Sequence, residues 1–345
     1  MASMISPSNK GRSVGVVMSI SGGPSLFDYF NGFEYVDPAS GSSDALTVEL
    51  ADDDLDWLKK YYPTLGTAIE ASISLTNWND SGDNKVLRVG TFTLDDAEFS
   101  GNPSTCRLSA LSKPADTSFS TRERTQVWED ATLAGIAGEL AGRYGLALNY
   151  KAKTINIKTI EQSQKTDMTF LLDLCESYDL GMKVYDKKLV IFDWGEMEAQ
   201  EPVLRINRPR IENDNYEYHD TLAGVYTGAR IQYKTEDDDE EISLFVGYKD
   251  EEGEGCRTLY MNETVDNAAE ADQKARAAVN KANREAVTFN CDIWPNVNVT
   301  SGVTIEIMNM GAADGKYFVD RMTFSRSGDS GAVQSLEMHK CQQRI

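Results

Sequence analysis

The stretch WEDATLAGIAGELAGRYGL (residues 128–146) divides the chain, because the spacing of apolar residues changes within it. Before this stretch, apolar and polar residues alternate, which is typical of half-buried strands. Within it, apolar residues recur every three or four positions, which predicts a helix with one buried face. Asp130 or Thr132 can cap the first turn, and Gly145 can adopt the left-handed conformation that ends a helix. The polar residues 112–125 are therefore interpreted as a linker that leads into a new domain.

A strand, a second helix and a hairpin complete this new domain. We expect the strand over residues 154–160 and the helix to begin near Thr166. Two apolar runs, residues 182–185 and 189–192, predict the hairpin. Residues 116–200 are thus predicted to form a small α/β domain inserted between two β-rich parts.

Residues 1–115 are predicted to form an antiparallel β-barrel. Apolar and polar residues alternate in short runs, separated by turn-forming Gly, Asn, Asp and Pro. Only residues 54–62 show helical spacing, and Pro63 ends that helix. Many short strands with one small helix favour a barrel. The clearest strands cover residues 14–20, 45–50, 68–75, 85–92 and 105–111.

Residues 201–345 return to the two-residue rhythm and predict a second β-barrel domain, so the fold class is a β-rich α+β protein. One alanine-rich helix, residues 268–285, interrupts the strands, and Asn267 can cap it. Two β domains with one helix each bracket the α/β domain, which hints at an internal duplication. The expected strands cover residues 224–234, 242–248, 286–293, 303–308, 316–325 and 332–340.

Composition and charge limit the classes of function. The chain has 345 residues, of which 41% are hydrophobic and 26% charged, as in an ordinary globular protein. Its formal charge of −21 opposes binding to phosphates, so we expect no specific nucleic-acid binding. The first ten residues lack the apolar core of a signal peptide and no run of residues is apolar enough to span a bilayer, so we expect a cytoplasmic product that is not an integral membrane protein. Five scattered cysteines predict reduced thiols.

Two acidic blocks, EDDDEE (residues 236–241) and DEEGE (residues 250–254), flank the expected strand 242–248. We interpret both as solvated loops at the ends of a hairpin. A calcium site is the alternative, because clustered carboxylates supply oxygen ligands, but the glycine-turned spacing of a dedicated calcium loop is missing.

No motif in the sequence would generate a nucleophile or hold a cofactor. The two histidines, His219 and His339, lie far in sequence from any plausible nucleophile, and His219 is expected to be a strand or turn residue satisfied by hydrogen bonds. The sequence has no Gly-x-Ser-x-Gly elbow, phosphate-binding loop or His-Glu-x-x-His helix. We therefore predict no catalytic residue, no cofactor and no metal site.

Carboxylates leave one enzymatic alternative open, because a cell-wall hydrolase needs only two of them around a sugar-binding cleft. Among the 55 acidic residues, Asp52-Asp53-Asp54 and Asp95-Asp96 are interpreted instead as a helix start and a strand turn. A cell-wall (peptidoglycan) hydrolase and a freestanding binding module are the two alternatives to a structural role.

Several stretches resemble the late control gene D proteins of phages. In the first β domain these are PTLGTAIEASI (residues 63–73) and VGTFTLDDAE (residues 89–98), and in the second they are YTGARIQY (residues 226–233) and the helix from Ala268. The acidic residues 236–241 have no place in the pattern. In the middle domain the similar residues are 128–137, 143–146, 162–163, 169–175, 181–185 and 189–192.

This resemblance implies a structural baseplate hub of a contractile phage tail or a related injection particle, without an active site. It implies a homotrimer in which each chain contributes two tube-like barrels to a ring. The implied partners are the hexameric tail tube protein, a separate trimeric central spike protein and other baseplate proteins, with the tape-measure protein as a candidate occupant of the lumen. The implied location is the virion tail baseplate, after assembly in the bacterial host cytoplasm. We further hypothesise that carboxylates line the lumen and repel DNA, as an alternative to acids that only keep the assembly soluble.

Overall fold

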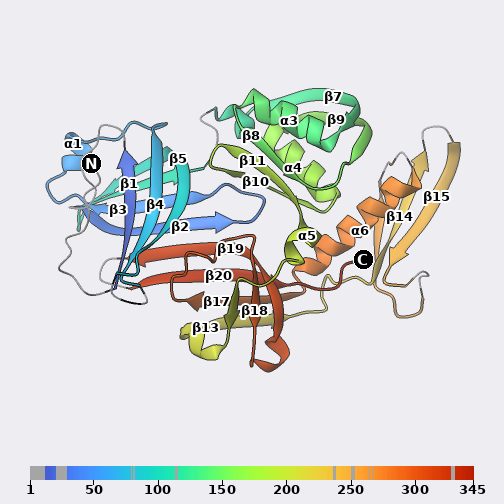
Figure 1. The fold of residues 1–345 in the computed structure, drawn as a ribbon. Coiled ribbons are helices and arrows are strands. Elements are labelled where there is room, and N and C mark those ends of the chain that lie inside the picture. Colours follow the sequence, from blue (N-terminus) through green and yellow to red (C-terminus); the bar gives the residue numbers. More distant parts are fainter. Residues whose placement is uncertain are drawn as a thin grey trace.

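The computed structural model describes residues 12–20, 29–78, 80, 82–112, 116–235, 238–249, 253–263, 265, 267–327 and 331–345. Two β-rich units lie side by side, and a small α/β domain and a separate sheet with a long helix lie beside them (Figure 1). No helix in the described part of the chain is long and apolar enough to cross a membrane.

The first β unit is built from six antiparallel strands and a single helical turn. The predicted alternation places every second residue of β4 in the core, for example Ile69 and Ile73. The expected helix at residues 54–62 is shorter than predicted, since only α1 (Asp56–Lys59) is helical. The strands are β1 (Ser13–Ile20), β2 (Phe30–Pro38), β3 (Ala45–Ala51), β4 (Ala68–Thr76), β5 (Lys85–Ser100) and β6 (Thr105–Leu111).

The second β unit also has six strands, but they are spread over the remainder of the chain. They are β12 (Leu204–Ile206), β13 (Ile211–Asp220), β17 (Val287–Ile293), β18 (Thr304–Ile307), β19 (Gly315–Ser327) and β20 (Ala332–Lys340). Two short 3-10 turns, η2 (Arg208–Arg210) and η3 (Gly311–Ala313), lie between them.

The two units have the same strand order. Numbered from one to six along the chain, the strands of each unit lie in the order 1-4-5-6-3-2, as β1-β4-β5-β6-β3-β2 and as β12-β18-β19-β20-β17-β13. All neighbours are antiparallel except the three-residue β12, which pairs parallel with β18. A shared order of six strands supports the internal duplication at which the sequence hints.

The two units are joined through their sheets, a connection that the sequence analysis did not predict. Strand β2 of the first unit pairs antiparallel with β19 of the second, so all twelve strands belong to one sheet. One hydrophobic core runs through both units, from Val14 to Met338. Because β2–β19 pairing joins residues far apart in sequence, alternation alone could not reveal it.

The α/β domain contains two helices, a three-stranded sheet and a two-stranded sheet. Its helices are α3 (Leu133–Arg143), capped by Thr132, one of the two predicted candidates, and α4 (Asp167–Ser177), capped by Thr166, near which a helix was predicted to begin. The expected linker at residues 112–125 is shorter, because α2 (Ser118–Thr121) and the start of β7 lie in it. The hairpin of β10 (Leu180–Tyr185) and β11 (Lys188–Asp193) has the predicted turn. The remaining elements are β7 (Glu123–Thr132), β8 (Ala147–Lys151), β9 (Asn156–Thr166) and α5 (Trp194–Glu198).

The alanine-rich helix does not belong to the second barrel sheet, where we had expected it. Helix α6 (Ala268–Arg284) packs its small residues on a separate three-stranded sheet, with Ala271, Ala275 and Val279 in that core. Strand β15 begins at Asp238, so residues 238–241 belong to a strand rather than to the predicted loop. Residues 236, 237 and 250–252 of the acidic blocks, and with them the calcium alternative, lie outside the described residues. The sheet consists of β14 (Gly228–Thr235), β15 (Asp238–Gly247) and β16 (Thr258–Asn262).

Candidate functional site

The strand β2 joins the two β units through the sequence FEYVD (residues 33–37). Tyr35 is only 3% exposed and lies opposite Phe324 of β19. The ring of Phe33 stacks on Phe324 with 5.6 Å between centroids. Because both edges of β2 are paired and its aromatic rings are buried, this joint is a continuous piece of core.

The strand β13 carries the sequence YEYHD (residues 216–220) at the equivalent place in the second unit. The pairing registers fix this equivalence. Tyr35 lies opposite Leu46 in β3, and Leu46 opposite Ala110 in β6. Tyr218 lies opposite Phe289 in β17, and Phe289 opposite Met338 in β20. Both strands therefore place aromatic, Glu, Tyr, one further residue and Asp at the same five positions.

The surroundings of β13 differ from those of β2, because β17 is its only partner among the described strands. Tyr216 is 41% exposed and stacks on Phe289 with 5.9 Å between centroids. Tyr218 packs partly buried against the core. Leu222, just after the strand, is 74% exposed. This edge is thus an aromatic and aliphatic strip with unpaired backbone groups.

A buried ionic cluster ties the end of β2 to the α/β domain and to the second unit. The Lys183 ammonium pairs with Asp37 and, at 2.6 Å, with Asp44. Tyr35 donates a hydrogen bond of 2.8 Å to Asp44, and the Ser301 hydroxyl donates one of 2.6 Å to Asp37. Burial raises the pKa of Asp44 to about 7, although Lys183 acts in the opposite direction. The cluster holds three parts of the chain in one arrangement.

A second buried cluster surrounds His339. Its Nδ1 lies 2.8 Å from Asp320 and its Nε2 lies 3.3 Å from Glu198, which also accepts a hydrogen bond of 2.6 Å from Arg344. Burial lowers the pKa of His339 and the two carboxylates raise it, with a net rise. Both ring nitrogens face carboxylates, and Arg284 lies 3.8 Å above the ring of Trp194. His339 of β20 therefore links β19 and α5, and neither ring nitrogen points towards open solvent where a ligand could bind.

The two predicted non-catalytic histidines line one groove, of about 750 Å³, between α6 and the sheet. His219 lies on the exposed strand β13, within the range of its strand-or-turn prediction. Asp52 accepts a hydrogen bond of 2.9 Å from the backbone of Trp57, which fits its predicted role at a helix start. Asp95 lies at a bulge in β5 rather than in a turn between strands. Neither Asp52 nor Asp95 lines the groove that the two histidines share.

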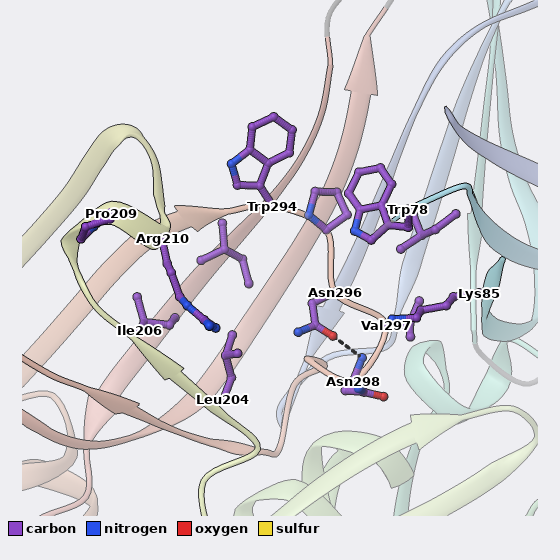
Figure 2. Close-up of a pocket in the computed structure, with 13 residues that line it drawn as sticks. Trp78, Lys85, Leu204, Ile206, Pro209, Arg210, Trp294, Asn296, Val297 and Asn298 are labelled. Atoms are coloured by element: carbon purple, nitrogen blue, oxygen red, sulfur yellow. Dashed lines mark hydrogen bonds between the residues drawn. The ribbon is translucent and has the colours of Figure 1, made fainter. Parts of the chain in front are cut away.

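A different hollow, of about 420 Å³, lies where the two β units meet (Figure 2). Trp78 comes from the turn after β4, and Trp294 follows β17. Asn298 donates a backbone hydrogen bond of 3.0 Å to Asn296. None of its 13 lining residues is acidic or histidine, and its charged lining residues are Lys85 and Arg210. No group of His, Cys, Asp and Glu in the described part of the chain is arranged to hold a metal ion.

Sequence reasoning missed the two strands that matter most here, β2 and β13. Neither was among the strands expected from alternation, although His219 was placed in a strand or turn. The repeat of FEYVD in YEYHD was the signal that could have found both. It is only five residues long, so its meaning becomes clear only when the strand registers align it.

Comparisons with known proteins point to phage tails. No protein-family model matches the sequence. The chain is 28% identical over 195 residues to the probable baseplate hub protein of Escherichia phage 186, in a match that covers 55% of this chain and 48% of that protein. The chain thus spans about half the length of the curated relative it matches.

Solved structures share nearly the whole fold. A tail protein from Neisseria meningitidis MC58 gives a TM-score of 0.72 at 15% identity, over 95% of this chain and 96% of that one. A prophage MuSo2 tail protein from Shewanella oneidensis gives 0.71 at 15% identity, over 95% and 99%. A component of the Escherichia coli type VI secretion system gives 0.61 at 11% identity, over 95% and 78%. The chain has the fold of phage tail proteins, and its resemblance to the baseplate hub proteins of phages is confirmed.

Proposed function

We propose that this chain is the structural baseplate hub of a contractile phage tail or of a phage-derived injection particle. The observation that carries the proposal is the duplicated β unit with a shared strand order. Two units per chain and three chains give six similar units, since 2 × 3 = 6. A trimer of this kind presents a pseudo-sixfold face to a hexameric tail tube and a threefold face to a trimeric spike.

The three parts of the chain have different roles in this proposal. Residues 1–115 and 201–345 supply the tube-like units of the ring, and the separate sheet with α6 is an addition to the second. Residues 116–200 lie outside the ring, where α3 and α4 contact other baseplate proteins and leave the channel open. The tape-measure protein is the candidate occupant of that channel during assembly in the host cytoplasm.

The hub acts as a connector in the virion tail baseplate and not as an enzyme. The burial of two residues with shifted pKa values supports this. Asp44 and His339 are both held inside ionic clusters. The charge of −21 supports a lumen that repels phosphate over about 8 Å at physiological salt.

Electron microscopy of the purified particle tests the proposal. We expect density for three copies of the chain between tube and spike, and a mass of the isolated hub–spike complex that corresponds to three hubs. A different number of copies, or a position away from the tube–spike junction, contradicts the proposed ring. A neutral or basic channel surface in that map contradicts the acidic lumen.

A further inference from the structure

The strand β5 has one backbone edge that is left unpaired along its second half. Thr93 is the last residue of β5 that pairs with both β4 and β6, on opposite edges. The backbone of Gly66, in a left-handed conformation with φ +85°, then donates to the carbonyl of Leu94. After the bulge between Leu94 and Asp96, residues 96–100 pair with β6 alone among the described strands.

The equivalent strand of the second unit, β19, shows what this edge can accept. Phe318 pairs with both β18 and β20, and Gly302, with φ +79°, donates to the carbonyl of Val319. A bulge follows between Val319 and Arg321. Beyond the bulge, residues 321–327 pair on the β18 side with strand β2 of the first unit. The edge that is unpaired in β5 is therefore occupied in β19.

The strand that would complete the pattern is β13, the equivalent of β2. Its edge away from β17 has no partner strand in the described part of the chain. The strands β13 and β5 lie in different units, far apart on the molecule, so one chain does not join them (Figure 1). Unpaired edges of this kind are templates for strand addition from another chain.

We propose that β13 of one copy pairs antiparallel with residues 96–100 of β5 in the next copy, and so repeats between chains the β2–β19 joint made within each chain. This inference rests on the proposed trimeric ring and specifies its contacts. The β2–β19 register, carried over, sets Glu217 opposite Ser100, Tyr218 opposite Phe99, His219 opposite Glu98 and Asp220 opposite Ala97.

The side chains on both edges fit this register. Tyr218 opposite Phe99 repeats the buried pair of Tyr35 and Phe324, and both Tyr218 and Phe99 are already partly buried against the core. On the other face, the imidazole of His219 can donate to the carboxylate of Glu98. Leu222, which is highly exposed, takes the place of Ala39, which is 4% exposed after β2. The joint would thus cover apolar surface that one copy leaves in water.

Cysteine cross-linking in the full-length chain tests the register. Directly opposed residues of an antiparallel pair have Cα atoms about 4.5–5.5 Å apart, within the range that a disulfide bridges. The double variant Glu98→Cys with His219→Cys should therefore oxidise to covalent dimers and trimers on a non-reducing gel. The variant Asp96→Cys with His219→Cys, two residues out of register, should cross-link far more slowly. Each single-cysteine variant controls for bridges to Cys256 or Cys341, which are partly exposed.

The mass of the unmodified chain, measured by analytical ultracentrifugation, distinguishes a failure of the proposed joint from a failure of the proposed ring. A trimer in which the in-register pair cross-links no faster than the out-of-register pair overturns the proposed joint and leaves the ring standing. A chain that stays monomeric at high concentration, without cross-links in any variant, overturns both the joint and the ring.

Discussion

The strands β2 and β13 carry nearly the same five residues in two different environments. In β2 the FEYVD sequence lies between β3 and β19, with its aromatic rings in the core. In β13 the YEYHD sequence lies at an edge, and Tyr216 is 41% exposed. The local sequence therefore specifies a strand, and the second partner strand determines whether its side chains are buried.

The two units also differ in what the chain inserts between equivalent strands. In the first unit a short segment, residues 39–44, connects β2 to β3. In the second unit the three-stranded sheet and α6 lie between β13 and β17. Hydrogen bonds from α6 to the α/β domain, such as Lys281 to Glu176 at 2.6 Å, fix this insertion against the rest of the molecule. The duplication thus persists in the sheet, while the insertions distinguish the outer surfaces of the units.

The largest expected effect is the difference in stability between a variant of the covered strand β2 and a variant of the edge strand β13. Tyr35→Ala removes a buried ring and its hydrogen bond to Asp44, so the free energy of unfolding should fall by about 5 kcal/mol. The matched variant Tyr218→Ala removes a partly exposed ring and should cost about 1 kcal/mol in the monomer. Chemical denaturation of both variants measures the difference. Equal losses would show that the second partner strand does not set the contribution of this tyrosine.

The sequence predicted most elements but not their partners. Caps and helical spacing placed α3 and α4 correctly, and alternation placed five of the strands in the first unit. The three-residue β12 is too short for alternation to detect, and β7 is mostly exposed, so neither was expected. Alternation also could not tell that β14 and β15 form a separate sheet, because periodicity gives the face of a strand but not its neighbour.

The next largest expected loss of stability comes from breaking the ionic cluster at the end of β2. Lys183→Met leaves Asp37 and Asp44 buried without their cation, and should lower the free energy of unfolding by about 3 kcal/mol at pH 8. The control Lys188→Met removes an exposed ion pair with Asp186 at 3.6 Å and should cost less than about 1 kcal/mol. Denaturant titrations of the two variants make the comparison. A cost at Lys183 no larger than at Lys188 would mean that the cluster does not hold the joint together.

The same cluster predicts a pH dependence. The pKa of Asp44 is about 7 in the folded chain and 3.8 in the reference state, so the folded chain binds more protons between these values. The contribution of Asp44 to stability is therefore present below about pH 4 and is lost as the pH rises towards 7, by at most about 1.4 kcal/mol per pH unit. Asp44→Asn should remove this slope, and the exposed Asp220→Asn should retain it. Stability measured from pH 4 to 8 provides the test, and an unchanged slope in Asp44→Asn contradicts it.

The smallest expected effect is the absence of cell-wall hydrolysis. A glycosidase places two carboxyl groups about 5–9.5 Å apart beside an open cleft, with one held protonated near neutral pH. Asp37 and Asp44 meet part of this description, since they share Lys183 and the pKa of Asp44 is raised, but their side chains are only 5% and 0% exposed. No sugar ring reaches them, whereas Asp220, the exposed equivalent of Asp37, lies on an unpaired strand edge. The purified chain incubated with peptidoglycan should release no reducing sugar, and Asp44→Asn and Asp220→Asn should match the unmodified chain. Turnover that one Asp or Glu substitution abolishes would show instead that the chain itself cuts the wall, and would identify the carboxylate responsible.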